Sequence, residues 1–266
     1  PNSIVGGALL IKNLTSNNAD KDIVLLNAPR IFCNDGTFRY EGAVHNMPVI
    51  NGQILQTEAT LNHYGYDSMD QELMERKFIR TSSILKKELE KNPDNIYYRF
   101  QLSVTYLMHK DYEQALEEIE LAYQKIKNNA AEKKKHIYVY YQLAKANLRL
   151  GKYLKAEEAC LEGIALEKEY LDLYFYLAQA QATQEKYEQA ITNYRHYLKL
   201  VENFDQLKIK WNPAINHHTL FYKEEALYNL SVMMFKLSRF DQALSYAEKI
   251  LQINQAEDKT ITQIIP

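Results

Sequence analysis

The chain has 266 residues, 46% hydrophobic and 25% charged, a composition typical of one large domain or two ordinary ones. Its 32 Lys and Arg against 34 Asp and Glu give a net charge of −2, which argues against bulk electrostatic capture of nucleic acid or anionic membrane. Cys33 and Cys160 form no CxxC pair, so neither a disulfide framework nor a cysteine zinc site is indicated, and we expect a cytoplasmic protein. The apolar runs fall far short of the ~20 residues of a membrane-spanning helix.

Glycine content divides the chain near residue 66. Six of the eight glycines lie before this point, and we assign residues 1–66 to a β-rich segment. We expect its strands at about residues 23–26, 30–32, 38–42 and 54–61. The tripeptide Asn34-Asp35-Gly36 predicts a hairpin turn between two of these strands, because glycine supplies the positive φ that such turns require.

The sequence after residue 66 is helical and repeats itself. A linking segment, residues 67–93, holds an amphipathic helix from about Gln71 to Lys91 that Pro93 closes. Beyond it, an aromatic-x-x-Ala unit recurs, in which the alanines are Ala115, Ala156, Ala190 and Ala243. Thirteen residues before each alanine is a leucine followed by a small residue, at 102–103, 143–144, 177–178 and 230–231. Small residues there let two antiparallel helices approach closely, while the aromatic residue fills the turn between them.

This register resembles the tetratricopeptide repeat (TPR), a helix-turn-helix unit of about 34 residues. The interval from Ala156 to Ala190 is 34 residues, and the intervals on either side, 41 and 53 residues, predict inserts near 127–136 and 203–221. The resemblance implies a mainly α fold, in which residues 94–266 form a superhelix of about four repeats behind the small β-rich segment. A single repeat cannot bury its own apolar face, so three or more must stack.

The two inserts differ in composition. The basic run Lys133-Lys134-Lys135 is interpreted as a solvated extension of two helices, with a patch for phosphate or lipid headgroups as the alternative. The second insert holds the only tryptophan, Trp211, which we expect to pack over a repeat edge. It also holds His217 and His218, and adjacent residues point to different sides of a helix or strand, so we expect no metal chelation by this pair.

In the family that these repeats resemble, the first helix of each repeat lines a concave groove. The register places an acceptor groove at Tyr97, Phe100, Tyr138, Tyr141, Lys145, Phe175, Gln179 and Tyr228, and adds Val104, Asp172, Glu225 and Val232. Such an aromatic, nearly neutral groove suits a peptide or carbohydrate rings, because tyrosine combines a large rigid face with one hydroxyl. Packing is the alternative role for any one of these tyrosines. The basic and amide positions of the dicarboxylate clamp are mostly apolar here, so capture of a chaperone tail is not expected.

Two motifs in the first segment resemble a family of enzymes. Residues 29–46 read PRIFCNDGTFRYEGAVHN, and residues 61–66 read LNHYGY. Their order is similar to the end of the catalytic domain in bacterial family 2 glycosyltransferases with appended TPRs. Together with the first repeat, the resemblance covers about residues 20–120. It implies that residues 1–66 are the end of a GT-A α/β domain, with a nucleotide-sugar donor, a divalent metal (Mg or Mn) and inverting hexosyl transfer.

The family's functional residues transfer only in part. His45 matches the family's histidine and is a candidate catalytic residue or metal ligand, with capping of a strand end as the alternative. Asn46 stands where the family has glutamate, and Asp20-Lys21-Asp22 does not occupy the family's Asp-x-Asp position. Glu41 is a second catalytic candidate near the acceptor, with a role as the cross-strand partner of Arg30 or Arg39 as the alternative. We expect the donor-binding portion to have been removed or to lie on another chain, leaving this chain inactive alone.

Two functions follow from these patterns. The first is the C-terminal region of a glycosyltransferase whose repeats bind a protein or peptide acceptor. The second is a non-enzymatic TPR scaffold for protein–protein interaction, with residues 1–66 as an N-terminal cap. A cap should be polar outside, whereas part of a larger sheet should leave apolar side chains uncovered. A homodimer is left open.

Overall fold

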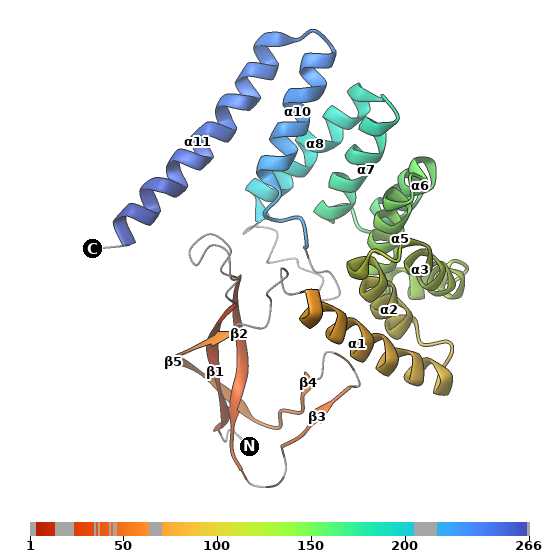
Figure 1. Cartoon of the computed structure of the whole chain (residues 1–266), viewed down its shortest axis with the longest axis vertical. Helices are drawn as coiled ribbons and strands as arrows, with labels where there is room; N and C mark the ends of the chain where they lie inside the picture. Colours follow the sequence, from red (N-terminus) through yellow and green to blue (C-terminus); the bar gives the residue numbers. More distant parts are fainter. Residues whose placement is uncertain are drawn as a thin grey trace. The chain divides into compact units, whose positions relative to one another are not determined.

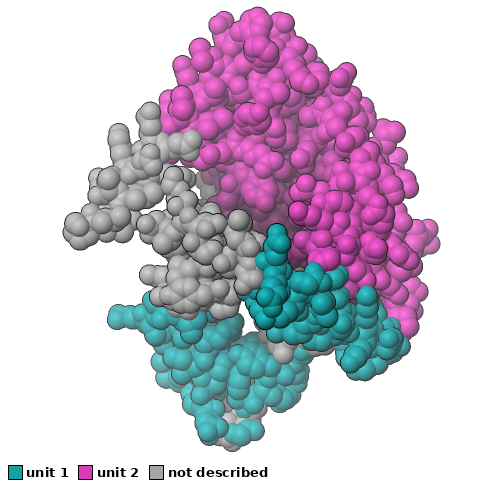
Figure 2. All heavy atoms as spheres, viewed as in Figure 1, with its two compact units in different colours: residues 1–91 teal, residues 92–266 magenta. Residues whose placement is uncertain are grey.

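A computed structural model describes residues 4–13, 24–34, 36, 38–42, 44, 47–63, 71–204 and 217–264. The chain divides into two compact units, Pro1–Lys91 and Asn92–Pro266, coloured separately in Figure 2. The boundary assigns the first long helix to the same unit as the strands. Each unit is described by itself below.

The first unit contains a small mixed sheet (Figure 1). Strand β1 (Ile4–Asn13) is central, antiparallel to β2 (Val24–Phe32) and parallel to β5 (Gln53–His63). Two short strands, β3 (Tyr40–Glu41) and β4 (Met47–Pro48), pair separately. Gly6 is required where β1 meets β2, because a Cβ there would lie 2.3 Å from the carbonyl oxygen of Ile31. Leu9 and Ile11 of β1 form a small buried cluster.

The hairpin expected at Asn34-Asp35-Gly36 is wrong. Gly36 does have the positive φ of a turn glycine, 77°. The strands before and after it are nevertheless not partners, since β2 pairs with β1 and β3 pairs with β4. Strand β1 was not expected from the sequence, and β2 pairs with it along almost its whole length. Along it, the two expected strands at 23–26 and 30–32 join into one.

Helix α1 spans Gln71–Lys91, as the sequence predicts. Ser82, Leu85 and Leu89 are its buried residues, and their spacing of three and four places them on one side of the helix. The helix ends two residues before Pro93, in accord with the restricted backbone of a residue that precedes proline.

The second unit is a stack of antiparallel helix pairs (Figure 1). The pairs are α2 (Ile96–His109) with α3 (Tyr112–Ile126), α5 (Tyr138–Arg149) with α6 (Tyr153–Leu166), α7 (Leu171–Thr183) with α8 (Tyr187–Glu202), and α10 (Lys223–Lys236) with α11 (Phe240–Ile264). The repeated aromatic residue is the first residue of every second helix. This confirms the mainly α architecture behind a small β-rich segment.

The repeated positions make the contacts within each pair. The repeated alanines and leucines are all buried. Where the small residue is a serine, its hydroxyl donates to the carbonyl oxygen of the repeated alanine, from Ser103 to Ala115 at 2.6 Å and from Ser231 to Ala243 at 2.9 Å. The turns between paired helices also recur, since the residue five positions before each alanine has a positive φ, at Lys110, Gly151, Glu185 and Ser238.

The first expected insert forms a helix of its own. Helix α4 (Ala130–Lys135) begins at Asn129, whose side-chain oxygen accepts from the backbone N–H groups of Ala131 and Glu132. Lys134 and Lys135 are exposed to solvent as expected. The segment does not extend the two neighbouring helices, however, because the cap at Asn129 starts a new helix. In the second insert, Trp211 lies outside the described residues, whereas residues 217–222 are described.

Candidate functional site on the first helices

The first helices of the first three pairs form a continuous row. Helix α2 contacts α5, and α5 contacts α7, whereas the second helices α3, α6 and α8 make at most marginal contacts with one another. In a curved stack, the elements that contact each other most closely lie on the inner side. The row α2, α5, α7 therefore forms the inner face of the stack in the second unit.

An aromatic cluster lies on α2 and α5. The ring of Tyr138 is 4.6 Å from that of Phe100 and 6.5 Å from that of Tyr97, in tilted and edge-on arrangements. Tyr97 is exposed, while Phe100 and Tyr138 are half-buried. The hydroxyl of Tyr138 is hydrogen-bonded to Nδ1 of His136 at 2.6 Å, and burial raises the pKa of the phenol. Three of the expected groove residues thus come together and leave one ring face accessible.

Other expected groove residues lie inside the stack. Tyr141 is 3% exposed and Phe175 is 1% exposed, so neither faces an open groove as the sequence predicted. The ring of Phe175 packs against Tyr194 and Tyr197 of α8, which is why it has no solvent-facing side. Tyr141 is covered by the ring of His218, stacked at 4.9 Å with an interplanar angle of 7°.

The remaining expected positions are more open. Lys145 is half-buried and donates to the hydroxyl of Tyr141 at 3.3 Å, and burial lowers the pKa of its ammonium. Gln179 of α7 is half-buried, and Tyr228 of α10 is exposed. The expected groove residues therefore do not form one continuous aromatic lining that runs from Tyr97 to Tyr228.

Asp172 holds the chain that precedes α10. Its carboxylate accepts from the backbone N–H of His218 at 2.9 Å and from the N–H and hydroxyl of Thr219 at 2.7 and 2.5 Å. Tyr197 of α8 donates to the carbonyl oxygen of Thr219. Residues 217–219 thereby occupy the inner face at α5 and α7, bound through their backbone as a peptide would be.

Burial shifts the pKa values of the titratable side chains around this contact. Burial raises the pKa of Asp172 to about 6, against the opposing effect of its three hydrogen bonds and of Lys145. Burial, and then the neighbouring His218, lower the pKa of His217 to about 4. Burial also lowers the pKa of His218, so both histidines are neutral at pH 7.

Sequence reasoning did not assign a role to His218 and Thr219. Asp172 was placed on the inner face by the repeat register alone. A buried acidic residue at such a position needs hydrogen-bond donors, and this requirement was the available signal that some segment would cover it. Nothing in the spacing identified residues 218 and 219 as that segment.

The enzyme candidates of the first unit are not brought into a site. Glu41 is exposed and forms an ion pair with Arg39 at 2.6 Å. Arg39 is one of the two expected partners, but the pair lies along one stretch of chain and not across two strands as the alternative had it. His45 and Asp20–Asp22 lie outside the described residues. The described residues hold no cluster of three or more His, Cys, Asp or Glu side chains that could bind a metal ion. None of the described helices is long and apolar enough to cross a membrane.

Comparison with known proteins identifies the fold of the second unit. No protein-family model and no curated protein matches the sequence. Among solved structures, the chain is similar to MamA, with a TM-score of 0.56 and 20% identity over 73% of this chain and 98% of that one. A MamA fragment from Desulfovibrio magneticus RS-1, residues 41 to the end, has a TM-score of 0.55, 14% identity, and 70% and 96% coverage.

A third solved structure names the repeat type. YrrB, described as a TPR protein with an unusual peptide-binding site, has a TM-score of 0.50, 14% identity, and coverage of 68% of this chain and 83% of that one. The helix pairs therefore have the TPR fold that the repeat spacing predicted. These likenesses concern the fold alone.

Proposed function

We propose that this chain is a TPR scaffold that binds a protein or peptide partner on the inner face formed by α2 and α5. The observation that carries the proposal is the cluster of Tyr97, Phe100 and Tyr138, in which the exposed ring of Tyr97 packs against Tyr138 and Tyr138 packs against Phe100. Exposed aromatic side chains on a rigid support are characteristic anchors of interfaces. The peptide-binding site named for YrrB supports the same kind of partner. A cytoplasmic location belongs to this proposal.

A second observation indicates how this inner face binds a chain. At α7, the carboxylate of Asp172 accepts hydrogen bonds from the consecutive backbone N–H groups of residues 218 and 219, and the ring of Tyr141 stacks on His218. An internal segment is thus held by backbone hydrogen bonds and ring stacking. We expect an external peptide at α2 and α5 to use aromatic contacts of the same kind.

The test is selection of binding peptides from a random library against the full chain, followed by affinity measurements on variants. Tyr97→Ala should weaken the selected peptides by at least tenfold, because it removes the exposed anchor. Leu154→Ala, at an exposed leucine of α6, is the matched control and should leave binding unchanged. Equal affinities for both variants would place the binding site elsewhere.

The glycosyltransferase assignment is a second proposal, supported by the motif order in residues 29–46 and 61–66. One observation favours it over a simple cap: Ile4, Ile31, Leu55 and Leu61 of the sheet are exposed, as expected for a sheet that packs against a further element. Mg²⁺ or Mn²⁺ and a nucleotide-sugar are part of this proposal, with His45 as the candidate ligand. We expect no sugar transfer by the 266-residue chain alone. Release of nucleoside diphosphate from a nucleotide-sugar by the purified chain would contradict this expectation.

A further inference from the structure

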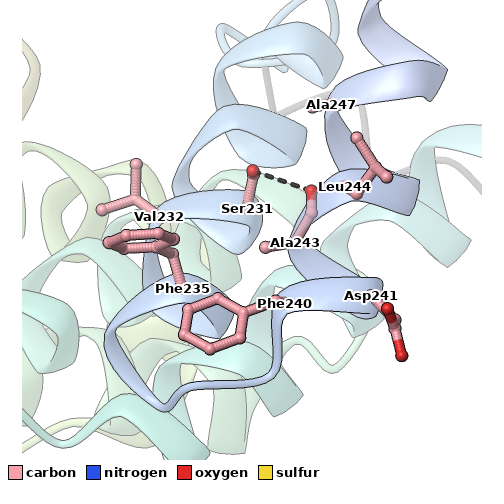
Figure 3. Close-up of a pocket in the computed structure, with 8 residues that line it drawn as sticks. All are labelled: Ser231, Val232, Phe235, Phe240, Asp241, Ala243, Leu244 and Ala247. Atoms are coloured by element: carbon pink, nitrogen blue, oxygen red, sulfur yellow. Dashed lines mark hydrogen bonds between the residues drawn. The ribbon is translucent and has the colours of Figure 1, made fainter.

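The last helix pair ends in an open apolar groove. We define the terminal groove by Ser231, Val232 and Phe235 of α10 with Phe240, Leu244 and Ala247 of α11. Figure 3 shows these side chains on α10 and α11, together with the hydrogen bond from the hydroxyl of Ser231 to the carbonyl oxygen of Ala243. The rings of Phe235 and Phe240 lie 5.4 Å apart and meet edge to face.

Comparison among the repeats shows what normally covers this groove. The residue after the repeated alanine is Leu116 in α3 and Ile191 in α8, which are 4% and 2% exposed. Helix α5 packs on α3, and α10 packs on α8. Leu244 occupies the same register position in α11 and is 61% exposed. The terminal groove therefore has the position that a following first helix covers in the earlier repeats.

Two further exposed side chains of the terminal groove are aromatic, and one acidic residue, Asp241, also lines it. Phe235 and Phe240 are 64% and 57% exposed. In stacked repeats, a face of a helix pair that no neighbouring repeat covers is usually polar. A contiguous group of exposed apolar side chains instead marks an interaction surface.

The helices seated in the earlier repeats show what such a groove accepts. Helix α5 contacts both helices of the preceding pair, α2 and α3, and α7 likewise contacts α5 and α6. In two of the three seated helices, α5 and α10, a buried apolar residue is followed three positions later by an amide, as in Val139 with Gln142 and in Ala226 with Asn229. The third, α7, has Tyr176 at the position of the amide. The amide hydrogen-bonds to the preceding pair: Gln142 donates to Ser103 Oγ at 3.0 Å, and Asn229 donates to the hydroxyl of Tyr194 at 2.9 Å.

Ser231 provides the same acceptor in the terminal groove. Ser103 and Ser231 hold one register position, and each donates its hydroxyl proton to the carbonyl of the repeated alanine. In Ser103, the oxygen also accepts from Gln142 of the seated helix. Among the described residues, none donates to Ser231 Oγ. The terminal groove thus has the apolar seat and the acceptor of the α2–α3 pair.

We propose that the terminal groove binds an amphipathic helix of a partner protein, which stacks as the next first helix. This helix presents an apolar residue to Leu244 and, three positions later, a glutamine or asparagine that donates to Ser231 Oγ. A second copy of the chain is disfavoured as the source. Its helices with this pattern, α5 and α10, are already seated in their own array, and Gln101 of α2 already has an interaction within the chain.

The test uses the full chain and a labelled peptide of residues 137–150, the sequence of α5, with blocked ends. Fluorescence anisotropy should show saturable binding. Leu244→Lys should weaken it at least tenfold, because a charge would enter the apolar seat. The matched control is Leu161→Lys, at an exposed leucine of α6, which should bind as the wild type does.

The hydrogen bond is tested by a double-mutant cycle. Replacing Gln142 by alanine in the peptide should weaken binding to the wild-type chain about fivefold, as expected for one neutral hydrogen bond. Against Ser231→Ala the two peptides should bind equally. This variant is expected to fold, because Ala144 and Ala178 hold the same register position in α5 and α7.

Three outcomes would overturn the proposal. The peptide could fail to bind, or Leu244→Lys could leave its binding unchanged. Sedimentation equilibrium could also show a dimer of the wild-type chain that Leu244→Lys abolishes and Leu161→Lys retains. That last result would assign the terminal groove to a second copy of this chain instead of a partner helix.

Discussion

Asp172 Oδ1 accepts hydrogen bonds from both the backbone N–H and the hydroxyl of Thr219, at 2.7 and 2.5 Å, across 47 residues of sequence. Both residues are fully buried. Since Tyr197 donates to the carbonyl oxygen of Thr219, every polar group of this threonine is bound by α7 or α8. The contact thus fixes the end of the second insert on the third helix pair.

Thr219→Val should destabilise the chain by about 1–2 kcal/mol. Valine has nearly the same shape, but it removes the hydroxyl donor and leaves a buried carboxylate with one partner fewer. Urea denaturation followed by circular dichroism measures the change. Thr192→Val is the control, because its exposed hydroxyl bonds only the carbonyl of Glu188 within α8, and it should change stability by less than about 0.5 kcal/mol. Equal effects of the two variants would show that the Asp172 contact contributes no stability.

Asp172 and His217 should act oppositely on the pH dependence of stability. The folded pKa of Asp172 is raised to about 6, so its stabilising contribution is present below about pH 3.8 and is lost as pH rises through 6. The folded pKa of His217 is lowered to about 4, so its contribution is present above about pH 6.5 and is lost as pH falls through 4. Between pH 4 and 6 the two contributions oppose each other.

Asp172→Asn should therefore make the free energy of unfolding rise more steeply from pH 4 to 6 than it does in the wild type. The raised pKa corresponds to a difference of about 3 kcal/mol at most across this range. His217→Phe should produce the reverse, a free energy of unfolding that falls with rising pH. Urea titrations at half-unit pH intervals measure both slopes. Parallel curves for the wild type and Asp172→Asn would refute the raised pKa of Asp172.

The repeats could be predicted from sequence because their contacts recur at fixed spacings. The alanine, leucine and small-residue positions each meet a partner within one helix pair, such as Ser103 with Ala115, only 12 residues apart. The sheet could not be predicted as well. Its central strand β1 pairs in parallel with β5, about 50 residues later, and no local pattern specifies that partner. In the first unit, the helix α1, the short strand β3 and most of the outer strands β2 and β5 were anticipated, whereas β1 and β4 were not.

The sequence predicted which residues lie on the inner face, but not which of them are exposed to solvent. The register placed Tyr141 and Asp172 on the first helices correctly, but exposure depends on what else covers them. Residues 217–219 come from an insert without repeat periodicity, so their arrival over Tyr141 had no signal in the spacing. Tyr97, near the start of the array, remains exposed.

Gly163→Ala should destabilise the second unit by about 1–3 kcal/mol. A Cβ at this position of α6 would lie 2.6 Å from Leu173 Cδ1 and 3.0 Å from Tyr140 Cβ, so the neighbouring helices would have to shift. Thermal denaturation measures the loss. Combining Gly163→Ala with Leu173→Val should cost less than the sum of the two single changes, because valine lacks the terminal methyl that the new Cβ meets. Strict additivity would show that the two side chains do not compete for space.

At equivalent positions in two of the turns between paired helices, we expect two substitutions to change stability in opposite directions. Gly151 has φ 69°, and an added Cβ would meet only the ring and hydroxyl of Tyr153, at 3.8 Å or more. Gly151→Ala should therefore cost about 1 kcal/mol through backbone strain alone. Ser238 has φ 57° in the equivalent turn, so Ser238→Gly relieves such strain and should increase stability by up to about 1 kcal/mol. Urea denaturation of both variants measures the two changes, and a destabilising Ser238→Gly would mean that the serine contributes more through its side chain than its backbone costs.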